Sequence, residues 1–94
     1  MKTIKKIPVE LILLKKGEYI PENMEFGKLY YSPEFNGMNH LCLCGCEQKT
    51  YILIKDGEWS LSENNGKVTI TPSILQRNGC KSHYIITNGI ANLV

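Results

Sequence analysis

The feature of this sequence that most constrains its fold is the grouping of its four cysteines and both histidines in two short segments. The first segment runs from His40 to Cys46 and the second from Cys80 to His83. Two groups of ligands on tight turns, brought together by the chain between them, are the usual plan of a small structural zinc site. The sequence therefore predicts a domain that closes around one zinc ion, Zn2+.

Other uses of the cysteines fit the sequence less well. The apolar run from Ile7 to Leu14 is broken by Pro8 and Glu10, so we expect it to belong to the fold and not to a signal peptide. No stretch approaches the roughly 20 apolar residues that a membrane span needs. We therefore expect a cytoplasmic protein with no membrane partner, and disulfides are disfavoured in that compartment. Buried thiols and disulfides are the alternatives to zinc.

The spacing of the first cysteine group narrows the ligand set. Sulfurs around one tetrahedral zinc ion lie about 3.8 Å apart, whereas residues i and i+2 of a strand lie about 6.6 Å apart. Cys42, Cys44 and Cys46 cannot all reach one ion unless the chain turns, and Gly45 can provide a turn because glycine accepts a positive φ. The favoured ligands are Cys44, Cys46, Cys80 and His83.

Two residues of the first segment have more than one possible role. Cys42 is a ligand in place of Cys44 or a buried thiol. His40 is a ligand, a group that supports a ligand, or a surface histidine. The choice of four ligands among these residues stays open, and the candidate metal site comprises Cys42, Cys44, Cys46, Cys80 and His83.

Turn signals recur along the chain, and the short apolar or alternating runs between them predict strands. The fold class is therefore β-rich, either all-β or α+β with little helix, built as a small antiparallel sheet or sandwich with hairpins. One short helix is expected between Pro72 and Gly79. The expected strands are Pro8–Leu14, Leu29–Ser32, Leu41–Cys44, Thr50–Lys55, Trp59–Ser62, Lys67–Thr71, Tyr84–Thr87 and Ile90–Val94.

Two hairpins are expected from turn dipeptides. Asp56-Gly57 should join Thr50–Lys55 to Trp59–Ser62, and Asn88-Gly89 should join the last two strands. The length of 94 residues predicts one domain over residues 1–94. A chain of this size buries only about 60–65% of its unfolded surface. A structural zinc, which contributes roughly 10–16 kcal/mol in small zinc peptides, would offset that shortfall.

Five blocks of the sequence form a recognisable set, in this order: Gly27–Ser32, His40–Cys46, Trp59–Leu61, Val68–Ile74 and Cys80–Ile86. Together they resemble a bacterial and phage family catalogued as domain of unknown function 6527. The resemblance covers most of residues 25–93, and Glu47 departs from it where a glycine is expected. It implies a metal-binding domain, encoded in some genomes beside components of bacterial ubiquitin-like conjugation.

Two classes of function are expected to compete. The first is a non-enzymatic, zinc-stabilised accessory module that binds a protein partner in a ubiquitin-like pathway or in phage–host interplay. The second is a zinc-dependent hydrolase or transferase with an open metal position, with Glu34, Glu47 or His40 as its base. The sequence has no His-Glu-x-x-His motif, which disfavours metalloprotease chemistry. A net charge of +2 disfavours nucleic acid as a partner, and the oligomeric state is not readable.

Overall fold

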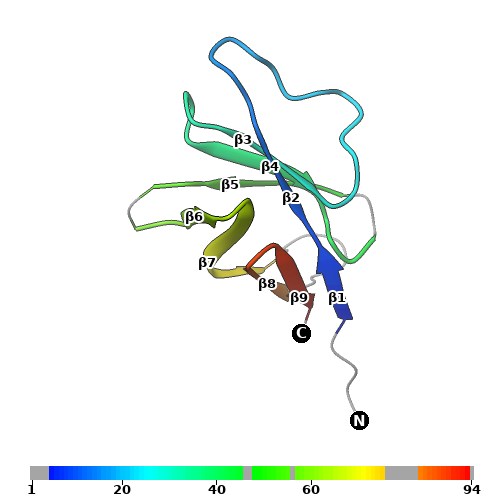
Figure 1. Cartoon of the computed structure of the whole chain (residues 1–94). Helices are drawn as coiled ribbons and strands as arrows, with labels where there is room; N and C mark the ends of the chain where they lie inside the picture. Colours follow the sequence, from blue (N-terminus) through cyan, green and yellow to red (C-terminus); the bar gives the residue numbers. More distant parts are fainter. Residues whose placement is uncertain (1–4, 46–47, 56, 76–82, 94) are drawn as a thin grey trace.

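The structure is a computed structural model and describes residues 5–45, 48–55, 57–75 and 83–93. Within these residues the chain forms strands and no helix, as the turn spacing predicted, and the strands make up two sheets (Figure 1). Accordingly, no helix long and apolar enough to cross a membrane occurs in the part of the chain that is described.

The larger sheet has five antiparallel strands in the order β1-β9-β8-β7-β6. Alternate residues of β8 are buried, as expected for a sheet with one face on the core. Tyr84 and Ile86 face inward, whereas His83 and Ile85 face outward. The bounds are β1 Lys5–Pro8, β6 Ser60–Asn64, β7 Lys67–Leu75, β8 His83–Thr87 and β9 Ile90–Leu93.

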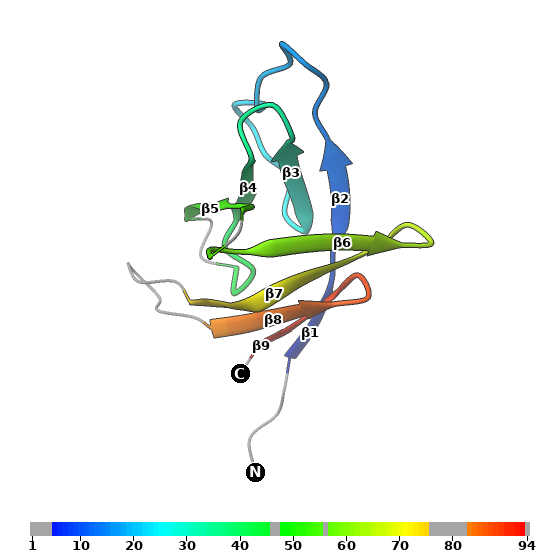
Figure 2. The same cartoon turned by 90° about the vertical axis from the view of Figure 1, so that its left-hand side faces the viewer.

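The smaller sheet has four strands in the order β2-β3-β4-β5. Its β2–β3 pair is parallel and its other two pairs are antiparallel. Figure 2 shows that β2, β3 and β4 run crosswise to β6, β7 and β8. The bounds are β2 Glu10–Leu13, β3 Lys28–Ser32, β4 Gly37–Leu41 and β5 Lys49–Leu53.

The main core lies between the two sheets. Both contribute large side chains that are fully or almost fully buried, and the removal of this apolar surface from water is the principal force that holds the sheets together. The core residues are Ile7, Leu29, Met38, Cys42, Leu43, Ile52, Val68, Ile70, Ile74, Tyr84, Ile86 and Ala91. A smaller cluster of Leu14, Met24 and Tyr30 lies apart from them.

Two tight turns fix the hairpins of the larger sheet. Asn65 and Gly66 both have positive φ, as do Asn88 and Gly89. Two consecutive positive φ values favour a turn whose twist matches that of the flanking strands. The predicted β8–β9 hairpin is therefore confirmed, and a second hairpin joins β6 to β7.

The predicted hairpin between β5 and β6 is wrong. The two strands belong to different sheets, and a single bridge in parallel orientation links Ile54, which follows β5, to Trp59, which precedes β6. The amide of Trp59 donates to the carbonyl of Leu53 over 3.2 Å, which turns the chain toward the other sheet. β6 instead pairs with β7, because the Asn65-Gly66 turn holds these two strands together.

Three further expectations need correction. The apolar run Pro8–Leu14 is not one strand, since Val9 separates β1 from β2 and the two lie in different sheets. The strand expected over Leu41–Cys44 ends at Leu41, where a turn begins. The helix expected from Pro72 is strand up to Leu75, because this segment pairs with β8, and its remainder lies outside the described residues.

Candidate functional site

The pairing of β7 with β8 contains an irregularity that shapes the candidate site. Ile70 pairs with Ile86, but the next pair is Ile74 with Tyr84. Between these two pairs β7 has two residues more than β8, and the extra residues form a bulge. Ser73 lies in this bulge, after a cis peptide bond between Thr71 and Pro72. Bulges re-aim side chains and are frequent beside active sites.

The bulge brings Ser73 against His83. The Oγ atom of Ser73 lies 2.6 Å from Nε2 of His83, and both side chains are half-buried. His83 begins β8 and belongs to its outward-facing residues, so the pair lies on the side of the sheet away from the core. A hydroxyl in hydrogen-bond contact with a neutral imidazole is the arrangement in which histidine can accept the serine proton and create a nucleophile.

A third side chain, from the residue just before β6, contacts the main chain of Ser73. The indole N–H of Trp59 donates to the main-chain carbonyl of Ser73 over 3.4 Å. Trp59 immediately precedes β6 and packs against the main core. Within the described residues, no carboxylate makes a hydrogen bond with His83. The described site is thus a serine–histidine dyad with a tryptophan behind the serine.

His40 has a different environment from His83. It is fully buried, and its Nε2 atom lies 2.6 Å from the hydroxyl of Tyr84, which links β4 of one sheet to β8 of the other. Its Nδ1 atom is buried and has no hydrogen-bond partner among the described residues. Burial disfavours the charged imidazolium and lowers the pKa of His40 from 6.5 to about 4. His40 is therefore not a surface histidine.

The cysteine segment forms a turn directly after β4. The amide of Gly45 donates to the carbonyl of Cys42 over 3.2 Å, and Gly45 has the positive φ expected of it, at 98°. The Sγ atoms of Cys42 and Cys44 lie 3.5 Å apart, Cys42 fully buried and Cys44 half-buried. The turn begins at Cys42 and not only at Gly45, which is why these two sulfurs meet.

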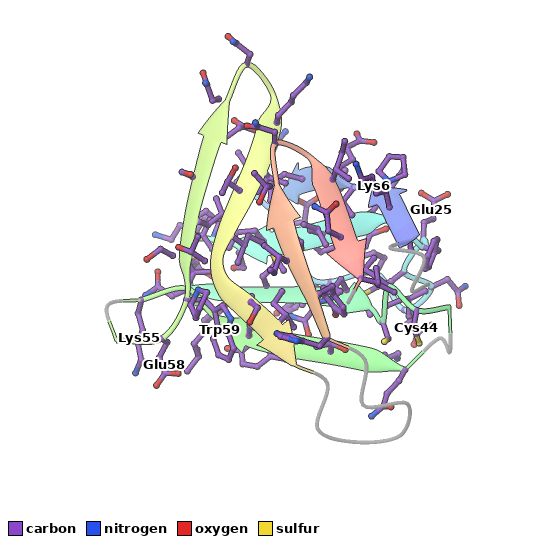
Figure 3. All side chains as sticks on the ribbon, turned by 90° about the horizontal axis from the view of Figure 1, so that it is seen from below. Lys6, Glu25, Cys44, Lys55, Glu58 and Trp59 are labelled. Atoms are coloured by element: carbon purple, nitrogen blue, oxygen red, sulfur yellow. The ribbon has the colours of Figure 1, made fainter. Side chains whose placement is uncertain are left out.

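The predicted metal ligands are only partly placed by the structure. Cys46 and Cys80 lie outside the described residues, as does Glu47. Within the described residues, no three or more Cys, His, Asp or Glu side chains gather closely enough to hold a metal ion. Figure 3 shows Cys44 and Trp59 far apart across the molecule, so the cysteine turn and the tryptophan beside Ser73 belong to different regions.

Ser73 was not among the candidate site residues predicted from the sequence. The signal was present, because Ser73 and His83 lie in two of the blocks that resemble a known family. The chain has only two histidines, so few serine–histidine pairs could form. The contact was hidden because it depends on the bulge, and a bulge has no reliable signature in the spacing of apolar residues. His83 was predicted from the sequence as a metal ligand and not as a partner of Ser73.

Comparison with known proteins gives one match. A family model described as bacterial ubiquitination-like system serine protease (BubE) matches residues 16–94, which include both sheets except for β1 and β2. No curated protein and no solved structure matches the chain. The matched range contains Ser73, His83 and all four cysteines. The chain belongs to the BubE family of bacterial ubiquitination-like systems.

Proposed function

We propose that this protein is a serine hydrolase that cleaves a peptide or isopeptide bond at a ubiquitin-like protein, with Ser73 as nucleophile and His83 as general base. The observation that carries the proposal is the 2.6 Å contact between Ser73 Oγ and His83 Nε2. Its support from outside the structure is the description of the family as serine proteases of a ubiquitination-like system. A hydrolase accounts for this contact, whereas the accessory module expected from the sequence does not require it.

The proposed reaction has two halves. In the first, His83 Nε2 accepts the proton of Ser73 while Oγ attacks the carbonyl carbon of the substrate, and the proton then passes to the leaving amine as the C–N bond breaks. In the second, His83 accepts a proton from water, the water oxygen attacks the acyl-serine, and the proton returns to Ser73 as the ester bond breaks. Atoms and charges balance with water as the only co-reactant.

The two histidines differ in their access to a substrate. His83 is half-buried on the outward face of its sheet, where a substrate can approach it. His40 is fully buried against Tyr84. His83 is therefore the histidine that we assign to catalysis.

The cysteine turn supports a second, structural role, and we propose that it binds zinc. Two cysteine sulfurs 3.5 Å apart fit the separation of about 3.8 Å between thiolates that share a tetrahedral zinc ion. Cys42 and Cys44 would hold the ion together with Cys46 and Cys80, which leaves both imidazoles to their contacts with Tyr84 and Ser73. A zinc ion with four thiolates cross-links the chain and takes no part in the hydrolysis.

Hydrolysis of a ubiquitin-like protein that carries a C-terminal peptide extension tests the proposed activity. A bacterial ubiquitin-like protein that carries such an extension is the substrate, and cleavage is followed by intact mass. We expect the wild-type protein to release the extension, and Ser73→Ala and His83→Gln to reduce the rate by at least about a thousandfold. Ser62→Ala, which changes an exposed serine on the neighbouring β6, is the matched control and should cleave at the wild-type rate. Equal cleavage by wild type and Ser73→Ala would refute the assignment.

A further inference from the structure

The main chain at Ser73 lies in an irregular part of the larger sheet. β6 pairs with β7 only as far as Ser60 opposite Thr71. On the other side the pairing with β8 resumes at Ile74. Among the described residues, no strand residue is paired in register with Ser73, so partners outside the regular strand pairing can contribute to holding its peptide groups.

Trp59 supplies one of these partners. Its indole N–H donates to the carbonyl of Ser73 over 3.4 Å. Trp59 comes just before β6, on the side of β7 where the pairing with β6 stops at Thr71. The tryptophan is itself held in two ways. Its own amide donates to the carbonyl of Leu53, at the end of β5, and its ring packs against the core. Because the main chain and the ring of Trp59 are both held, its indole N–H can restrict the position of the Ser73 carbonyl.

The position of the carbonyl of Ser73 affects the position of its hydroxyl. The carbonyl carbon and Cβ share the same Cα, so a carbonyl fixed by a hydrogen bond restricts rotation of the serine main chain. The direction of the Cα–Cβ bond then sets which side-chain rotamer brings Oγ to His83. A nucleophile displaced by about 1 Å can lose about a hundredfold in rate.

We propose that Trp59 is a positioning residue for Ser73: its indole N–H holds the carbonyl of the serine and thereby keeps Oγ in contact with His83. This inference rests on the proposed function. Trp59 touches neither the proton that is transferred nor Oγ, so it acts through Ser73 alone. Its effect should fall on the rate at which Ser73 reacts and not on the affinity for whatever approaches it.

The test uses a fluorophosphonate, which reacts with activated serines and needs no identified substrate. Two variants remove the indole N–H. Trp59→Phe also shrinks the ring, whereas Trp59→β-(3-benzothienyl)alanine keeps the shape of the indole. Tyr51→Phe, which removes one ring-borne donor from an exposed aromatic residue on β5, is the control. For each protein one measures the maximal rate of phosphonylation of Ser73, the reagent concentration at half-maximal rate, and the pH profile.

We expect both Trp59 variants to lose about tenfold in the maximal rate, with the half-maximal concentration and the midpoint of the pH profile unchanged. Tyr51→Phe should react as the wild type does. If the benzothienyl variant reacts at the wild-type rate, the ring packing matters and not the N–H, and the inference is wrong. If the wild-type protein is not modified at Ser73 at all, the proposed function fails and takes this inference with it, so the two failures are distinguishable.

Discussion

At the scale of single residues, the two histidines show how environment decides what one side chain can do. His40 is enclosed between the sheets with Tyr84, and His83 lies on the outward face beside Ser73. An imidazole held away from water stays neutral over a wide pH range but cannot meet a substrate. A half-buried imidazole in contact with a hydroxyl can exchange protons with that hydroxyl and with a substrate. The fold thus separates a histidine enclosed in the core from the histidine to which we assign reactivity.

The burial of His40 predicts how the free energy of unfolding depends on pH. Its pKa is about 4 in the folded protein and 6.5 as the unperturbed value. Between these values the unfolded chain binds a proton that the folded protein does not, so the free energy of unfolding falls as the pH falls from 6.5 to 4. Urea unfolding across this range should show that His40 accounts for a loss of about 3 kcal/mol.

The variant His40→Gln separates this effect from others. Glutamine does not titrate, so its free energy of unfolding should fall less steeply between pH 6.5 and 4 than that of the wild type. Protonation of cysteine thiolates in acid affects both proteins alike and cancels in the difference. Parallel curves for the two proteins would show that His40 does not titrate as its burial requires.

Residue types could be identified from the sequence more readily than their contacts. The His40–Cys46 and Cys80–His83 segments could be singled out by their cysteines and histidines. The pairing of Ser73 with His83 could not be predicted, because the two residues come together only when β7 and β8 pair with a shifted register. A register shift is set by the packing of both strands on the core, which local sequence does not encode.

At the scale of elements, turns were more predictable than strand partners. Asn88-Gly89 was recognised as a hairpin turn, because asparagine and glycine accept the positive φ values that such a turn requires. Asp56-Gly57 carried the same signal, yet β5 and β6 separate into different sheets. A turn dipeptide shows that the chain changes direction, but the burial of the flanking strands decides whether they pair.

The turn after β4 carries the prediction about zinc. We expect the purified protein to contain about one zinc ion per chain, and a chelator to remove it and to lower the free energy of unfolding by several kcal/mol. Cys42→Ser should lower the zinc content and the melting temperature together, since Cys42 is fully buried at the turn. Metal analysis and thermal unfolding provide the two readouts.

Restoration serves as the control for the zinc prediction. Zinc added back after chelation should return the wild type, but not Cys42→Ser, to its original melting temperature. A protein that is purified without bound metal and melts at the same temperature before and after chelation would contradict the zinc proposal. The assignment of Ser73 and His83 would stand, because no step of the proposed hydrolysis involves the ion.

At the scale of the whole molecule, the division into two crossed sheets puts the core and the proposed site on opposite faces of the larger sheet. The inner faces carry the core, and the outward face of the larger sheet carries the dyad. The β-rich class followed from the turn spacing. The division itself could not be predicted, because β1 and β2 lie in one apolar run that gives no sign of the break at Val9.

The break at Val9 gives a prediction about how the sheets are joined. The amide of Val9 donates to the carbonyl of Gly89 over 2.8 Å as the chain passes from β1 to β2. Val9→Pro removes this donor and should lower the free energy of unfolding by about 1–3 kcal/mol more than Val9→Ala, which keeps it. Denaturant unfolding measures both. Equal losses would mean that this hydrogen bond does not hold the junction.

The central claim is that Ser73 is a nucleophile activated by His83. The most direct measurement is the site of modification after a brief treatment of the folded protein with a fluorophosphonate, mapped by peptide mass spectrometry. We predict a single adduct on Ser73, formed by the wild type and absent from His83→Gln and from protein unfolded in urea. An adduct on another residue, or an unmodified Ser73 in folded wild-type protein, would contradict the claim.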